Sequence, residues 1–124
     1  MFPLAKLILK GALQRDECRG AHYKPEFSMP GIEADDPAER RRLAEEWCDR
    51  FEENTKKWLK TTVARHGDDG HPVLTYEDVD TSIISPRPRL YGLVGGEVIE
   101  EVWRERQQAR AQAAPQPATV GAGG

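Results

Sequence analysis

Residues 36–51 read Asp-Pro-Ala-Glu-Arg-Arg-Arg-Leu-Ala-Glu-Glu-Trp-Cys-Asp-Arg-Phe and combine a helix start with an apolar stripe. An acid at the N-cap, a proline at the first helical position and a glutamate at the third form a capping box. Apolar residues then recur at every fourth position, as Leu43, Trp47 and Phe51. Because this is the period of one helix face, the stretch predicts a helix that begins at Pro37.

The apolar stripe continues beyond residue 51 with Trp58, Leu59, Thr62 and Val63. A break near Asn54 would divide it, so the pattern predicts one long helix or two. The arginines and glutamates between residues 39 and 53 are expected to form a solvated face with i,i+4 ion pairs. Cys48 lies on the apolar stripe, where we expect a buried, unreactive thiol.

A second helix is predicted over residues 4–14, where the polar positions Lys6, Lys10 and Gln14 form one narrow stripe. We expect only this stripe to face water, because every other position is apolar or small. The rest of the chain offers few large apolar side chains to cover such a helix. We therefore expect a partner surface outside this chain, and a domain truncated at its N-terminus.

The remaining sequence is poorer in apolar residues. Residues 66–70 predict a turn, residues 72–79 a short extended segment, and the Pro-rich residues 85–89 a polyproline-like path. A polar helix is predicted after Gly95-Gly96. The fold class is therefore mainly α, a small three-helix-like domain with a short extended segment. We place the domain at residues 1–91, a polar helical extension at 92–113 and a disordered tail at 114–124.

Composition limits the function. The chain has 124 residues, of which 18 are Lys or Arg and 21 are Asp or Glu, with a net charge of -3. Because the two signs are interspersed, nucleic acid is not an expected partner. The two cysteines, Cys18 and Cys48, indicate neither a zinc site nor a disulfide framework. No stretch approaches the roughly 20 apolar residues of a membrane span, so membrane association would need a partner.

The densest group of unusual residues follows the first predicted helix and comprises Arg15, Glu17, Arg19, Gly20 and His22. If the helix continued, the two arginines would share a face and could hold Glu17, Asp16 or an acid on another domain. Gly20 permits a turn with positive φ. The group is either a polar anchor at a domain junction, part of an anion site, or a helix C-terminus with its favourable cations.

The same group resembles a known family. Arg15-Asp16-Glu17-Cys18-Arg19-Gly20-Ala21-His22 is similar to the R-x-E-S-R-G-A-H fingerprint in the C-terminal domain of succinate dehydrogenase and fumarate reductase flavoprotein subunits, with Cys18 in the place of serine. Residues 58–62 resemble the helix that follows in this family, and residues 76–89 resemble the closing segment of one subgroup. Residues 28–57 are longer than the family pattern and are interpreted as an insertion.

The resemblance implies the oxidation of succinate to fumarate, or its reverse, by a subunit that carries FAD. It further implies three partners: the flavin-binding remainder of the subunit, an iron–sulfur subunit, and a membrane-anchor cytochrome b subunit that passes electrons to quinone. The expected location is the inner face of the cell membrane. The chain has no G-x-G-x-x-G motif, and no catalytic, cofactor-binding or metal residue carries over, so we expect the isolated chain to be inactive.

Two other functions stay open. The chain could be a stand-alone, non-catalytic assembly module that recruits a partner through Val98, Ile99, Val102 and Trp103. It could also be a fragment of an L-aspartate oxidase, against which residues 76–89 argue. His66, Asp68, Asp69 and His71 could suggest a metal site, but they lie in a Gly-containing stretch that favours a solvated turn.

Overall fold

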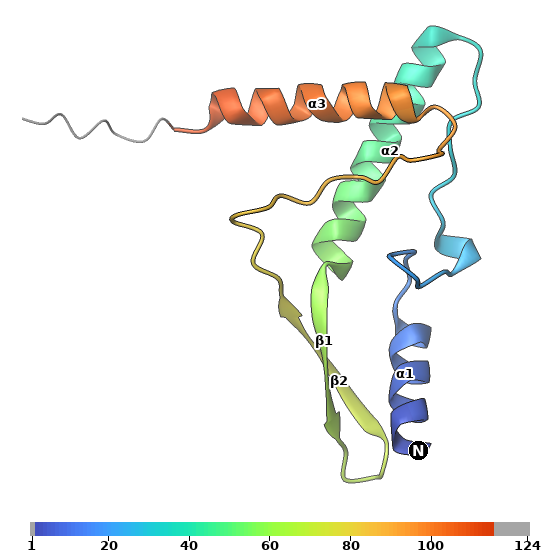
Figure 1. The fold of residues 1–124 in the computed structure, drawn as a ribbon, viewed down its shortest axis with the longest axis vertical. Helices are drawn as coiled ribbons and strands as arrows, with labels where there is room; N and C mark the ends of the chain where they lie inside the picture. Colours follow the sequence, from blue (N-terminus) through green and yellow to red (C-terminus); the bar gives the residue numbers. More distant parts are fainter. Residues whose placement is uncertain (1, 116–124) are drawn as a thin grey trace, which may run out of the picture.

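The computed structural model describes residues 2–115, and for Phe2 the backbone alone. It contains α1 (Phe2–Gln14), a short 3-10 helix (Pro25–Phe27), α2 (Pro37–Trp58), β1 (Lys60–His66), β2 (Pro72–Asp78) and α3 (Gly96–Ala113). The mainly α fold class is thereby confirmed. Figure 1 shows α3 crossing α2 at one end of the molecule, with α1 beside the β1–β2 hairpin at the other. Most of the predicted disordered tail, residues 116–124, lies outside the described residues.

The helix α2 begins where its capping box predicts and is continuous. The side chain of Asp36 accepts a hydrogen bond from the backbone N–H of Glu39 at 3.0 Å. The expected break near Asn54 is absent from this helix, which runs from Pro37 to Trp58. Extending the helical stripe to Thr62 and Val63 was wrong, because these residues belong to β1. Consecutive β-branched residues from position 61 favour a strand, and residues 72–78 supply its pairing partner.

The strands β1 and β2 form a two-stranded antiparallel sheet. Lys60 pairs with Asp78 at one end and His66 with Pro72 at the other. The turn closes through Gly67, whose N–H donates to the carbonyl of His71 at 3.0 Å. Gly70 adopts a φ of 79°, a left-handed conformation that favours glycine. The predicted turn and extended segment are confirmed, and the extended segment proves to be half of a hairpin.

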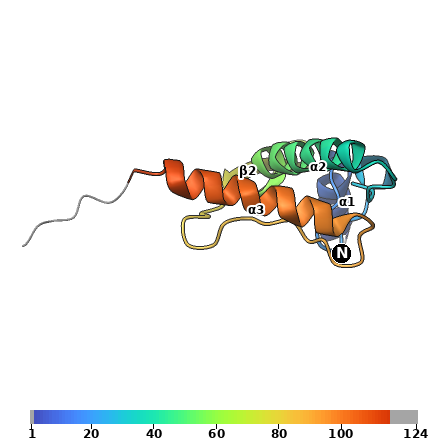
Figure 2. The ribbon, with the colours of Figure 1, turned by 90° about the horizontal axis from the view of Figure 1, so that it is seen from above.

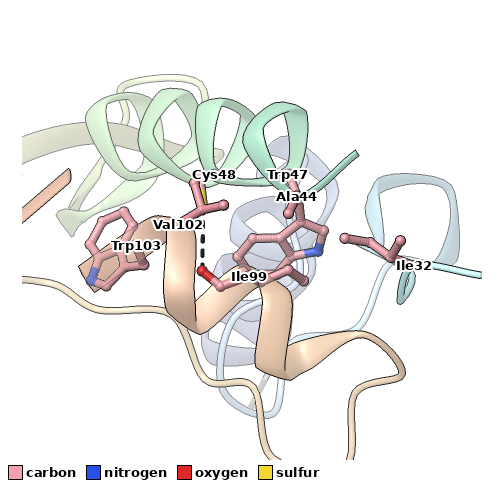
Figure 3. Close-up of a cluster of buried hydrophobic side chains, with 7 residues drawn as sticks. All are labelled: Ile32, Ala44, Trp47, Cys48, Ile99, Val102 and Trp103. Atoms are coloured by element: carbon pink, nitrogen blue, oxygen red, sulfur yellow. Dashed lines mark hydrogen bonds between the residues drawn. The ribbon is translucent and has the colours of Figure 1, made fainter. Parts of the chain in front are cut away.

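The buried core lies between α2 and α3. It consists of Ile32, Ala44, Trp47, Cys48, Ile99, Val102 and Trp103. Figure 3 shows side chains of α2 and α3 facing one another in this cluster. The ring of Phe51 stacks on Trp47 with centroids 5.9 Å apart and meets Trp103 edge-on at 5.3 Å. Viewed from above in Figure 2, the two helices cross in adjacent layers.

The contacts of α1 differ from the expectation in part, since Lys6 and Gln14 are exposed as expected but the hairpin bonds to the stripe. Its polar stripe was expected to face water, yet Lys10 donates to the carbonyl of Pro72 and Gln14 accepts a hydrogen bond from the hydroxyl of Tyr76. The hairpin therefore binds two of the three polar positions, while the side chains of Lys6 and Gln14 stay exposed. The large apolar side chains Leu4, Ile8, Leu9 and Leu13 are instead 59% to 74% exposed. The physical reason is that polar strand groups can satisfy Lys10 and Gln14, whereas the hairpin has little apolar surface to offer.

Candidate functional site

A buried carboxylate lies just after α1. The side chain of Glu17 is 2% exposed and is held between two arginines. Arg15 Nη1 lies 2.5 Å from Glu17 Oε1, and Arg19 Nε lies 3.0 Å and 3.2 Å from the two carboxylate oxygens. Burying a carboxylate is costly unless it is paired and hydrogen-bonded. The two guanidinium groups meet that requirement, so Glu17 and its arginines form one unit.

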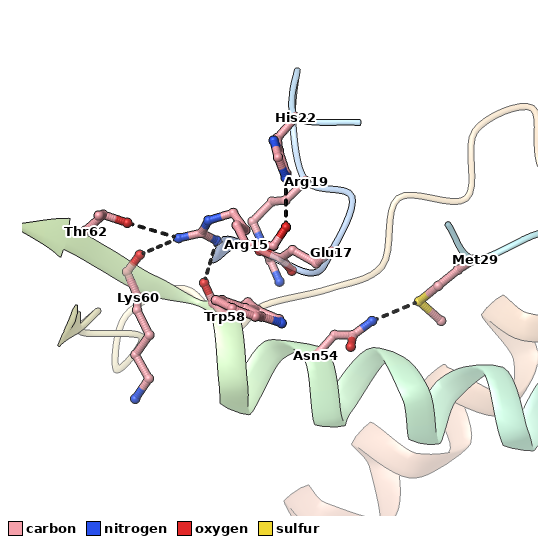
Figure 4. A network of polar contacts seen from close by, with 9 residues as sticks. All are labelled: Arg15, Glu17, Arg19, His22, Met29, Asn54, Trp58, Lys60 and Thr62. Carbon is pink, nitrogen blue, oxygen red and sulfur yellow. Dashed lines mark hydrogen bonds and ion pairs between the residues drawn. The ribbon is translucent and has the colours of Figure 1, made fainter. Parts of the chain in front are cut away.

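Arg15 extends this unit to the hairpin. Its guanidinium donates to the backbone carbonyls of Trp58 at 2.8 Å and Lys60 at 3.3 Å, and to the hydroxyl of Thr62 at 3.4 Å. It also lies over the Trp58 ring, 5.6 Å from its centroid. Figure 4 shows these contacts converging on one guanidinium. Arg15 thus joins the end of α1, the end of α2 and the start of β1.

A tight turn positions the second arginine. Gly20 has a φ of 61°, which confirms the predicted positive φ. Arg19 and His22 exchange two backbone hydrogen bonds of 3.1 Å across this turn. The Nε2 atom of His22 lies 3.0 Å from the carbonyl oxygen of Arg15. Because a carbonyl oxygen only accepts, Nε2 carries the proton and donates. His22 therefore ties the turn back to the end of α1.

The five residues singled out in the sequence do come together, though by a different route from the one expected. The two arginines do not share a helix face, because α1 ends at Gln14. They meet because both bind Glu17, which is one of the three acids considered. Asp16 instead pairs with Lys24 at 2.6 Å. The thiol of Cys18 lies 3.2 Å from the carbonyl oxygen and 3.3 Å from the amide nitrogen of Lys24.

The hydrogen-bond acceptors of Arg15 could not be predicted from the sequence. Trp58 was assigned to the core stripe of α2, and Lys60 and Thr62 to the same helix. Two of the three acceptors are backbone carbonyls, which carry no residue-type signal. The one usable signal was the β-branched run at residues 61–63, which marks the end of the helix.

In this structure the group forms a clamp around Glu17, a carboxylate of the same chain. Both oxygens of Glu17 accept from arginine, and the two guanidinium charges are directed at this carboxylate and at backbone carbonyls. In the turn at residues 66–71, the Asp69 carboxylate accepts a hydrogen bond from the backbone N–H of His71 at 3.0 Å. This hydrogen bond lowers the pKa of Asp69. Among residues 2–115, no cluster of three or more His, Cys, Asp or Glu side chains could hold a metal ion.

The residues present do not fit a flavin site. A dinucleotide phosphate is held at a Gly-rich turn between a parallel strand and a helix. The sheet found in the described part of the chain is a two-stranded antiparallel hairpin. FAD would therefore need residues from another domain.

Over residues 2–115, no helix combines the length and apolar character that a bilayer crossing requires.

Two comparisons with known proteins identify relatives of this chain. The family model described as "Fumarate reductase flavoprotein C-term" matches residues 1–91. The succinate dehydrogenase flavoprotein subunit of Bacillus subtilis (strain 168) is 38% identical over 92 residues, which cover 73% of this chain and 12% of that protein. No solved structure matches the chain.

The matched region contains the whole clamp, α1, α2 and the hairpin, whereas α3 follows it. The chain spans only about an eighth of the relative, so the two share one domain and not an entire enzyme. The chain belongs to the fumarate reductase flavoprotein C-terminal family, the C-terminal domain of succinate dehydrogenase and fumarate reductase flavoproteins.

Proposed function

We propose that this chain is the C-terminal domain of a succinate dehydrogenase flavoprotein subunit and that it packs against the flavin-binding remainder through α1. The observation that carries the proposal is the orientation of α1. Two polar side chains of α1, Lys10 and Gln14, already bind the hairpin. The exposed apolar side chains of the helix are Leu4, Ile8, Leu9 and Leu13. Contiguous exposed apolar side chains of this kind mark an interaction surface.

The clamp gives this surface a fixed direction. Arg15 ties the end of α1 to β1 and to the end of α2, so the helix cannot rotate its apolar face inward without breaking those contacts. Fixing the geometry beforehand reduces the ordering cost of association. The domain therefore contributes packing, and the residues that act on substrate belong to the remainder of the subunit.

The complete subunit would interconvert succinate and fumarate with FAD held by the remainder. Electrons would pass to an iron–sulfur subunit and then, through a membrane-anchor cytochrome b subunit, to quinone. The complex would lie on the inner face of the cell membrane, attached by its partner subunits. These assignments rest on the family and on the similarity to the Bacillus subtilis subunit.

An immunoblot of native membranes with an antibody against this chain tests the proposal, with covalent flavin fluorescence scanned on the same gel. A single fluorescent band several-fold heavier than the 14.0 kDa of this chain supports it. A band near 14.0 kDa without fluorescence contradicts it and supports a stand-alone module. A flavoprotein band whose activity requires L-aspartate instead of succinate would identify an oxidase of that amino acid.

The interface itself is tested by Leu9→Asp in the full subunit, with Ile83→Asp as the matched control. Both side chains are exposed in this chain, Leu9 on α1 and Ile83 in the connector before α3. Because burying an unpaired carboxylate is costly, Leu9→Asp should lower the yield of assembled, flavin-containing subunit about tenfold or more. The control should assemble normally. Equal yields for the two variants would refute the assignment of α1 as the interface.

A further inference from the structure

The helix α3 lies outside the family-matched residues, yet it completes the core. The match ends at residue 91, and α3 begins at Gly96. Its side chains Ile99, Val102 and Trp103 are buried against Ala44, Trp47 and Cys48 of α2. Without α3, the aromatic face of α2 would be open to solvent. The covered surface is therefore an apolar helix-docking face whose occupant is residues 96–113.

Ion pairs reinforce this contact along its length. Arg106 of α3 pairs with Asp49 at 2.8 Å, approaches Glu52 at 3.5 Å and donates to the Glu45 carbonyl at 3.2 Å. Arg110 pairs with Glu52 at 2.7 Å. Two further pairs have the arginine on α2 and the glutamate on α3: Arg40 with Glu97, and Arg41 with Glu105. The expected i,i+4 pairs are present at exposed positions of α2, as Arg41–Glu45 and Arg42–Glu46. Within the same charged set, Arg40, Arg41 and Glu52 also connect the two helices, which sets the register of α3 on α2.

The route of the chain favours docking within one molecule. The connector of residues 79–95 is anchored before α3 begins, because the Ile32 N–H donates to the Val94 carbonyl at 2.8 Å. Arg87 in the connector also pairs with Glu100 of α3 at 2.9 Å. These contacts fix the connector at the start of α3, and the pair of Arg40 with Glu97 holds that start beside α2. The hairpin and α1 pack together at the other end of α2, so the two contact regions are largely separate.

We propose that residues 92–113 are a brace that acts in cis, closing the aromatic face of α2 and opening as one unit without unfolding the hairpin. Four side chains were considered for recruiting a partner, and the brace uses them within the chain: Ile99, Val102 and Trp103 are buried, and the half-buried Val98 packs against the same core. The brace is independent of the proposed packing of α1, which uses a different surface.

Cys48 reports directly on the closed brace. Its side chain is fully buried beneath α3, with Sγ 3.9 Å from the carbonyl oxygen of Ile99. Burial also raises the pKa of the thiol. In a Cys18→Ser background, Cys48 is the single thiol of the 124-residue chain. Its rate of labelling by a thiol reagent at fixed pH, compared with the rate in guanidinium chloride, measures how often the brace opens.

In the native chain, Cys48 should label about 100-fold more slowly than in the unfolded chain. Arg106→Gln should raise the native rate about 5- to 30-fold, and added salt should raise it in the parent chain, because interhelix ion pairs are lost or screened. Arg104→Gln, at an exposed position of α3, is the matched control and should stay within about twofold. Equal rates for Arg106→Gln and Arg104→Gln would refute the ion-paired brace.

A second variant, Val102→Asp, places a carboxylate in the core and should displace α3. We expect Cys48 of this variant to label at nearly the unfolded rate while amide hydrogen exchange in β1 and β2 stays protected. A Cys48 that remains protected would show that α3 is not its cover. Loss of hairpin protection together with the labelling would show that the brace does not open as a separate unit, and would overturn the proposal.

Discussion

Replacing Arg15 with alanine should destabilise the domain by about 3–4 kcal/mol, and replacing Arg19 by only about 1–2 kcal/mol. The two arginines bind the same buried carboxylate but differ in exposure, with side chains that are 17% and 34% exposed. Arg15 also donates to Trp58, Lys60 and Thr62, whereas the side-chain bonds found for Arg19 go to Glu17. The larger loss therefore belongs to Arg15.

The Arg15 figure follows from these contacts. Breaking a buried ion pair by removing one partner costs about 3–5 kcal/mol, because the other charge is left uncompensated. Partial solvation of Arg15, and the charge of Arg19 that stays beside Glu17, place the expected value in the lower part of that range. For Arg19, a charged hydrogen bond is worth about 1.5–3 kcal/mol, and its greater exposure reduces this.

Urea unfolding of the 124-residue chain, followed by far-UV circular dichroism, measures both values. Arg42→Ala is the control, since this side chain is 57% exposed and pairs with Glu39 and Glu46 within α2. It should change the free energy of unfolding by less than about 0.5 kcal/mol. An Arg15→Ala variant within about 1 kcal/mol of the parent, or an Arg19→Ala variant that is the less stable of the two, would refute the clamp argument.

Other substitutions test separate features. Gly20→Ala should cost about 1–2 kcal/mol by urea unfolding, because alanine is strained at a φ of 61°, and Gly11→Ala in α1 should not. Trp103→Ala should cost about 3–5 kcal/mol by the same measure, since it opens a cavity beside Phe51. The hydrogen bond from Arg41 lowers the pKa of Glu105, so this pair should stabilise the chain above the ordinary glutamate pKa and lose that contribution as the pH falls through the lowered value. Glu105→Gln should remove this part of the acid dependence in a pH series of urea midpoints, and an unchanged series would contradict it.

The elements that could be predicted were those with local signals. The capping box located the start of α2, Gly95-Gly96 located α3, and the glycines of residues 66–70 located the hairpin turn. Gly20 was correctly assigned a positive φ. The C-terminal end of α2 was missed because Trp58 and Leu59 continue a helical spacing that is interrupted only by strand pairing with residues 72–78. Pairing partners distant in sequence leave no trace in a local pattern.

In the candidate site too, local features could be predicted from the sequence and long-range contacts could not. The sequence identified Arg15, Glu17 and Arg19 as a charged group, because arginines flanking an acid are chemically distinctive. It could not select Glu17 over Asp16 as the shared acid. That choice depends on which carboxylate is directed toward both arginines and buried there, and the folded arrangement of α1, the turn at Gly20 and the start of β1 sets this.

The sequence by itself determined where α2 and α3 begin, the turn glycines and the family fingerprint, because each depends on residues that are neighbours along the chain. Only the tertiary structure decided that the hairpin binds Lys10 and Gln14 of α1 and that α3 closes the aromatic face of α2. An amphipathic helix specifies which face is apolar but not what lies against either face. That outcome depends on which surfaces the rest of the chain can bring into contact, and here the apolar face of α1 is left outward.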